Sequence, residues 1–108
     1  MSGPADCQVL GRWRIIESDI WDEGYLDLVD PATIVFEANG HGKFAFGCVQ
    51  AGMDLECGRS IVFFRWAGCD EGDDVTGSGL AELNDDGTLE IELSFDNGDD
   101  VVLSARRE

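Results

Sequence analysis

Residues 10–21 read LGRWRIIESDIW and place Gly11 and Trp13 at the head of a strand-like run. A bulky Trp just after a Gly, this close to the start of a short chain, suits a ring that plugs one end of a small closed β-barrel. The fold then depends on whether the remaining residues supply the other strands of such a barrel.

Alternating apolar runs separated by turn residues follow this stretch, a pattern typical of an all-β meander or barrel. They predict eight strands, over residues 9–17, 32–38, 43–50, 53–58, 60–68, 75–83, 88–95 and 100–106. We therefore expect a single β-barrel domain over residues 1–108, an eight-stranded antiparallel meander closed into a small barrel.

Short turns set the expected register of these strands. Ala51-Gly52, Gly58-Arg59 and Asn97-Gly98 are interpreted as two-residue hairpin turns. Alternation then places Ile61 and Phe63 on the outer face, beside acidic strand residues. The inner face carries Phe44, Phe46, Cys48, Leu55, Cys57, Val62, Phe64 and Trp66, continued by Leu89, Ile91, Leu93 and Phe95.

Two further segments have positional meaning. Gly77 and Gly79 interrupt a predicted strand, which indicates a bend or the packing of a ring against bare backbone. Residues 18–31, SDIWDEGYLDLVDP, carry Trp21, Tyr25, Leu28 and Val29 at helical spacing. This segment predicts a short helical lid between the first two strands, lying across a barrel mouth.

The charge balance excludes several classes of partner. The chain has 23 acidic residues against seven basic ones, a formal net charge of −16. Such a surface repels phosphates and anionic lipids, so we expect neither nucleic-acid nor membrane binding. The chain has no apolar run long enough to span a bilayer, and its first residues lack the features of a signal peptide. The expected location is the cytoplasm.

No residue pattern predicts catalysis or metal binding. The four cysteines are widely spaced, without Cys-x-x-Cys, and His41 is a lone turn histidine. The acidic loop over residues 70–74 does not match the spacing of an EF-hand. We therefore expect four free thiols, no metal, no cofactor, no catalytic residue and no enzymatic activity.

The early Gly-x-Trp, the lid segment and the eight-stranded meander together resemble the calycin group, which includes lipocalins and fatty-acid-binding proteins. In that group the Trp of the first strand packs beneath an Arg of the last strand. The resemblance implies that Gly11 and Trp13 join Arg106 or Arg107 in closing the barrel. The two-residue turn at Asn97-Gly98 favours Arg106, since it sets Leu89 opposite that residue.

The chain also resembles, over nearly its full length, a family of small, uncharacterised bacterial proteins. The similar stretches are GRWRIIE, WDEGYLDLVDPATIVF, GKFAFGCV, FRWAGCDEGDDVTGSGLAEL and DDGTLEI. This resemblance implies a fold and no particular activity.

Three hypotheses about function follow. The first is a non-catalytic barrel, either filled by its core or binding a small apolar ligand among Phe44, Phe46, Phe64, Trp66 and Tyr25. The second is an acidic interaction module, of the immunity-protein or nucleic-acid-mimic type, that acts on a basic partner. The third and least favoured is enzymatic activity from carboxylates inside the barrel, although no pair can be placed at a reactive spacing. In addition, we expect Phe63 and Ile61, rimmed by Asp54 and Glu56, to form a homodimer interface.

Overall fold

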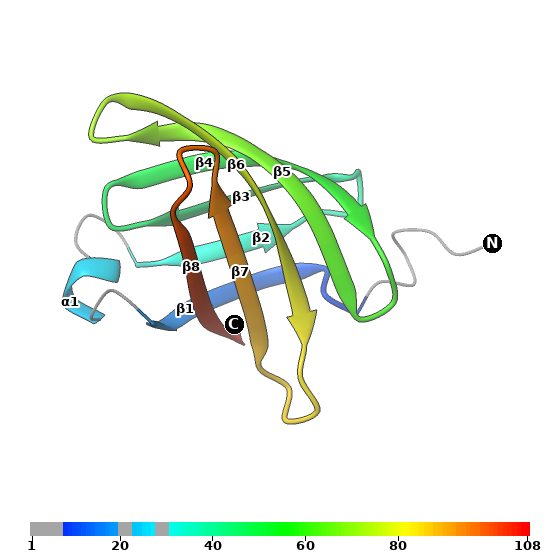
Figure 1. Ribbon diagram of the computed structural model, residues 1–108. Helices are drawn as coiled ribbons and strands as arrows, with labels where there is room; N and C mark the ends of the chain where they lie inside the picture. Colours follow the sequence, from blue (N-terminus) through cyan, green and yellow to red (C-terminus); the bar gives the residue numbers. More distant parts are fainter. Residues whose placement is uncertain (1–7, 20–22, 28–30) are drawn as a thin grey trace.

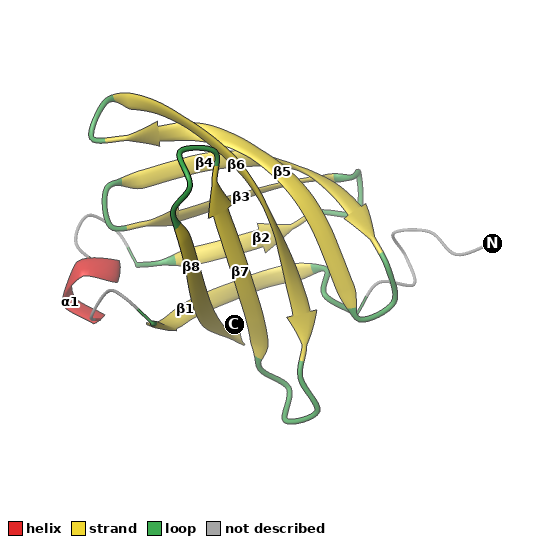
Figure 2. Ribbon diagram, viewed as in Figure 1, coloured by secondary structure: helices red, strands yellow, loops and turns green. Residues whose placement is uncertain are grey.

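The computed structural model describes residues 8–19, 23–27 and 31–108, which form a closed antiparallel β-barrel (Figure 1). Each strand pairs with the next along the chain, and the first pairs with the last. The expected eight-stranded barrel, with a short helix between its first two strands, is confirmed (Figure 2). The elements are β1 (Gly11–Ser18), α1 (Glu23–Leu26), β2 (Thr33–Phe36), β3 (His41–Phe46), β4 (Val49–Cys57), β5 (Ile61–Asp70), β6 (Asp73–Leu83), β7 (Leu89–Phe95) and β8 (Asp100–Arg107).

Alternation along each strand decides which side chains enter the barrel. In β7, Leu89, Ile91 and Leu93 are buried, whereas Glu90 and Glu92 are exposed. The inward rows of all eight strands merge into one apolar core. A shift of one residue in any pairing would expose a whole apolar row, so burial fixes the register strongly.

Three of the hairpin loops share one local geometry. In each, a Gly at positive φ follows an Asn or Asp whose side-chain oxygen accepts a hydrogen bond from the backbone N–H two residues further on. This is a three-residue loop, in which the left-handed Gly lets the strands pair again at once. The residues are Asn39-Gly40, Asp86-Gly87 and Asn97-Gly98.

The turn between β3 and β4 is not where the sequence predicted it. Gly47 and Cys48 form the turn, and Ala51-Gly52 lies inside β4. Gly47 has a φ of 54°, which the first position of this tight turn requires. Phe46 therefore faces Val49 instead of Cys57, and Cys48 leaves the inner row for the end of the barrel.

The pairing of β4 with β5 also differs from the two-residue turn expected at Gly58-Arg59. Gly58 donates its N–H to the Ile61 carbonyl across 2.7 Å, which lengthens the loop. Cys57 consequently faces Val62, and Leu55 faces Phe64. The displacement is an even number of residues, so each side chain keeps its expected face.

Two inward glycines make room for aromatic rings, as the sequence indicated. Gly77 lies opposite Trp66, and Gly79 lies opposite Phe64, across the β5–β6 pair. A Cβ at Gly77 would lie 2.6 Å from Trp66 Cζ2, and one at Gly79 would lie 2.7 Å from Phe64 Cζ. The rings therefore pack directly on β6 backbone.

The lid helix α1 covers the end of the barrel that contains the β3–β4 turn. Leu26 is buried, and its carbonyl accepts a 2.8 Å hydrogen bond from Gly47 N–H. Arg14 holds the lid to β1 through Asp27, at 2.7 Å. Of the lid residues expected at helical spacing, residues 21, 28 and 29 lie outside the described residues. No helix in the described part of the chain is long and apolar enough to cross a membrane.

Replacement of the glycine beneath Trp66 tests this packing. We expect Gly77→Ala to lower the free energy of unfolding by about 2–3 kcal/mol, because the added methyl would collide with the Ser94 carbonyl oxygen on β7 and with the Trp66 ring. Gly52→Ala is the matched control, since its Cβ would meet no atom closer than 4.0 Å. Urea denaturation measures both variants, and equal stabilities would contradict the proposed ring-on-backbone contact.

Candidate functional site

Trp13 on β1 and Arg107 on β8 join the first and last strands of the barrel. The Arg107 guanidinium carbon lies 4.1 Å from the centroid of the Trp13 ring, a cation–π distance. The guanidinium also donates to the carbonyls of Gln8, at 2.6 Å, and Leu10, at 2.8 Å. Trp13 is fully buried and donates its indole N–H to the Val9 carbonyl at 2.8 Å. The cluster fastens the segment before β1 to the last strand.

Gly11 is part of the same closure. It has a φ of 122°, and a Cβ at this position would lie 2.8 Å from Arg107 Nη1. A larger residue would therefore be strained and would also displace the guanidinium. Gly11 and Trp13, which the sequence predicted to help join the first and last strands, therefore both lie against Arg107 of β8.

The cation over Trp13 belongs to Arg107, whereas the two-residue turn had favoured Arg106. Asn97-Gly98 lies in a three-residue loop, with Phe95 N–H donating to the Asp99 carbonyl at 2.7 Å. Leu89 therefore faces Ala105. This change of one residue places Arg106 on the exposed outer face.

The four rings expected to line an apolar ligand pocket are buried inside the barrel, where each packs against another aromatic ring. Phe44 lies 5.4 Å from Trp66 and 5.7 Å from Phe46, measured between ring centroids. Phe64 packs 6.3 Å from Phe36, and all four expected rings are at most 4% exposed. Their mutual contacts are those of a core.

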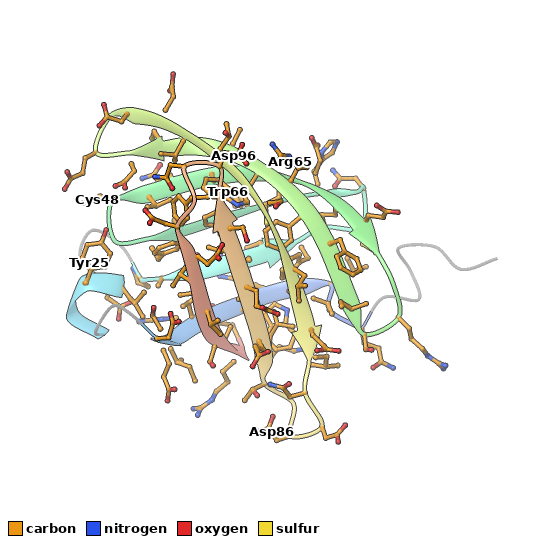
Figure 3. All side chains as sticks on the ribbon, viewed as in Figure 1. Tyr25, Cys48, Arg65, Trp66, Asp86 and Asp96 are labelled. Carbon is orange, nitrogen blue, oxygen red and sulfur yellow. The ribbon has the colours of Figure 1, made fainter. Side chains whose placement is uncertain are left out.

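Tyr25, the fifth expected ligand residue, lies at the lid end of the barrel beside Cys48 (Figure 3). Burial raises the pKa of Tyr25, and the Asp70 carboxylate adds to the rise. Burial also raises the pKa of the Cys48 thiol, with a further contribution from Glu71. A thiol kept protonated is a weak nucleophile, so this cluster offers little for covalent catalysis.

The outer face of β4–β7 carries an apolar patch with carboxylates beside it on β4, β6 and β7 and Arg65 next to it on β5. Phe63 is 50% exposed, the highest value among the large apolar side chains described. Its cross-strand neighbours are Glu56 on β4 and Leu80 on β6, and Leu80 in turn faces Glu92. We call Ile61, Phe63 and Leu80 the outer patch. The sequence placed Ile61 and Phe63 here, but only the β5–β6 register identifies Leu80.

Two carboxylates face each other directly beside this patch. Glu82 is opposite Glu90 across the β6–β7 pair, and Ile61 is the neighbour of Glu82 on β5. Like charges at facing positions destabilise a sheet. The sequence did not reveal this pair, because the facing positions depend on the exact length of the loop at Asn84–Gly87.

A groove follows the outer side of the β4–β5 pair. Its three consecutive hollows, of about 310, 420 and 890 Å³, share lining residues with one another. The first contains Phe63 and Glu56, the second is floored by Gly52 and Ala67, and the third has Lys43 at its wall. We call this feature the β4–β5 groove.

Two hydrogen-bonded groups of side chains line the middle of the groove. His41 Nδ1 lies 3.0 Å from Asp54 Oδ1, across β3–β4. Arg65 donates to Asp96 at 3.2 Å, and the Thr76 hydroxyl donates to the same oxygen at 2.7 Å (Figure 3). The Thr76 hydroxyl, and then the Arg65 cation, lower the pKa of Asp96. The four ionisable side chains are each more than half exposed, so these are surface contacts at the edge of the groove.

Within the described ranges, no three His, Cys, Asp or Glu side chains gather in a way that could hold a metal ion. Cys48 and Cys69 are free thiols, and Cys7 lies outside the described residues. The chain matches no protein-family model, and no curated protein matches its sequence. The resemblances to calycins and to small bacterial proteins therefore stay predictions, while the small closed β-barrel is compatible with a non-catalytic, ligand-binding barrel.

We call Trp13, Arg107 and the Gln8 and Leu10 carbonyls that Arg107 binds the closure cluster. Its contribution to stability can be measured by comparing Arg107 with its exposed neighbour Arg106. Arg107→Ala is expected to lower the free energy of unfolding by about 2 kcal/mol, because it removes a cation–π contact and two hydrogen bonds. Arg106→Ala, which removes the same charge from the exposed face, should change it by less than about 0.5 kcal/mol. Chemical denaturation monitored by Trp fluorescence distinguishes the two, and the reverse order would restore Arg106 as the closing residue.

The facing carboxylates also make a measurable prediction. Glu82→Gln should raise the free energy of unfolding by about 0.5 kcal/mol at low salt, since it removes a like-charge pair. Added salt should shrink this gain by screening. Glu92→Gln, whose cross-strand neighbour is Leu80, serves as the control and should gain less. A gain that is equal in both variants would show that net charge alone is responsible.

Proposed function

We propose that this barrel is a non-catalytic binding protein that recognises a basic partner protein through the outer patch and its acidic rim. The rim consists of Asp54, Glu56, Glu82, Glu90 and Glu92. The observation that carries the proposal is Phe63, a half-exposed aromatic ring near carboxylates, whereas the other large apolar side chains described are buried or partly buried. An apolar anchor inside a charged rim is the usual anatomy of a protein interface.

The facing Glu82 and Glu90 support a cationic partner. A Lys or Arg placed between them would turn a destabilising pair into a favourable one. The formal net charge of −16 would also steer a basic protein toward the barrel over long distances. A second copy of this chain would bring two acidic rims together, which disfavours the homodimer relative to a basic partner.

The interior supports the choice of the outer face. Phe44, Phe46 and Trp66 are in contact through Phe44, Phe64 packs on Phe36, and Gly77 and Gly79 bring the β6 backbone against Trp66 and Phe64. Binding of a ligand among these rings would require them to move apart. A small apolar ligand is therefore the second candidate, and the calycin-like closure at Trp13 and Arg107 is the observation that favours it.

A non-catalytic role and a cytoplasmic location belong to the same proposal. The raised pKa of the Cys48 thiol supports the first, because it lowers the fraction of nucleophilic thiolate. The free thiols of Cys48 and Cys69 suit a reducing compartment and support the second.

A cationic amphipathic peptide of Leu and Lys is a suitable probe for the proposed function. We expect its affinity for the barrel to fall with salt, and to fall about tenfold with Phe63→Ser at fixed salt, as for loss of an interface anchor. The double variant Glu82→Gln, Glu90→Gln should also weaken binding. Isothermal titration calorimetry gives all of these affinities.

The control for charge is the double variant Asp73→Asn, Asp99→Asn, which loses the same charge from the start of β6 and from the β7–β8 loop, at the other end of the strands. If both doubles weaken binding equally, only net charge attracts the peptide and the proposal is wrong. Light scattering adds a second check. A wild-type dimer that Phe63→Glu converts into a folded monomer would assign the outer patch to self-association instead.

A further inference from the structure

The β4–β5 groove connects the outer patch to the basic side chains of the barrel. Asp54 and Arg65 line both its first and second hollows, while Gly52 and Ala67 line both the second and third. These are directly opposite pairs on β4 and β5, so the groove runs along the two strands. From Phe63 to Cys69 it extends about 20 Å, at about 3.3 Å per residue.

The floor of the groove permits close approach along its length. Gly52 and Ala67 are exposed and face each other, and Ala45 adds a third small residue in the largest hollow. Small side chains on two adjacent strands leave the outer surface hollow where longer side chains would fill it. The groove can therefore receive an element thicker than a single side chain.

The two ends of the groove differ in charge. Glu56 lies at the Phe63 end, with Glu82 beyond Ile61. Lys43 and Arg12 line the other end, where Asp74 stands on the opposite wall. Arg12 pairs with Glu108 at 3.0 Å, whereas no ion pair involves Lys43 among the described residues. Lys43 is therefore the cation best able to meet a carboxylate from outside.

The closed barrel restricts the kind of segment that can bind here. In the groove, β5 pairs along its length with β4 and β6, so it offers no free backbone edge to an added strand. An extended peptide buried in the groove would leave many of its own N–H and C=O groups without partners. An α-helix satisfies these groups internally, and about 13 residues of helix cover 20 Å.

We propose that the β4–β5 groove receives an amphipathic helix of the partner protein, basic where it meets Phe63 and acidic where it meets Lys43. This inference rests on the proposed function, since it describes how the same partner continues beyond the outer patch. The basic end supplies attraction and steering. The acidic end fixes the direction of the helix, because a reversed helix would place like charges together at both ends of the groove.

A phage-displayed library of Ala-based helical peptides, about 14 residues long and randomised on one face, tests this inference. Selection on the wild-type barrel should enrich peptides with Lys or Arg near one end and Glu or Asp near the other. The enriched peptides are then synthesised, and fluorescence anisotropy measures their dissociation constants for barrel variants whose fold is verified by circular dichroism.

We expect Ala67→Arg, which fills the groove floor, to weaken binding about tenfold or more. Gly52→Arg serves the same purpose if Ala67→Arg does not fold. Lys43→Glu should weaken binding as well, and replacing the peptide's acidic residue with Lys should restore it. Arg106→Glu is the matched control, with the same change in charge on the outer face of β8, and should leave affinity within about twofold.

Each other outcome contradicts a defined part of this scheme. Failure to enrich any helical peptide overturns the inference. If Ala67→Arg and Lys43→Glu leave the affinity of the enriched peptides unchanged while Phe63→Ser abolishes binding, the outer patch is the binding surface and the groove is not. If Phe63→Ser and the double variant Glu82→Gln, Glu90→Gln also leave the affinity unchanged, the proposed function is wrong as well.

Discussion

Closure of the barrel between β1 and β8 is the constraint on which the other properties of this protein depend. The cation–π contact between Arg107 and Trp13 and the hydrogen bonds to Gln8 and Leu10 fasten the two ends of the chain. Once closed, the sheet has no edge strand, because each strand has a hydrogen-bonded neighbour on both sides. Any surface for recognition must then be made of side chains on the outer face, which is why an exposed Phe63 among carboxylates carries so much functional weight.

The sequence predicted the architecture well because alternation depends only on whether positions are odd or even. The β3–β4 turn lies at Gly47-Cys48 instead of Ala51-Gly52, yet Phe44 and Phe46 still point inward. The displacements in β3–β4 and β4–β5 are both even, so faces survive although partners change. The β7–β8 loop differs by a single residue, and there the expected inward Arg106 gives way to Arg107.

The candidate site was harder to predict because it depends on partners across strands. Phe63 was recognisable as an outward apolar residue from β5 alone. Leu80, the facing Glu82 and Glu90, and the floor pair of Gly52 and Ala67 need the register of three hairpins at once. Gly52 shows the difficulty clearly. In the sequence alone, the glycine after Ala51 indicates a turn, whereas in the folded sheet it lies at the centre of the groove.

The meander order of the strands has a consequence for how the chain folds. Seven of the eight pairings join neighbours in the sequence, and only β1–β8 brings together residues as distant as Gln8 and Arg107, 99 positions apart. Local hairpins close quickly, whereas a contact of such long range carries the largest loss of chain entropy. We therefore expect the hairpins to assemble first and the closure cluster to form after the folding transition state. The stabilisation from Arg107 would then act mainly by slowing unfolding, which makes the last contact to form the one that sets the lifetime of the folded barrel.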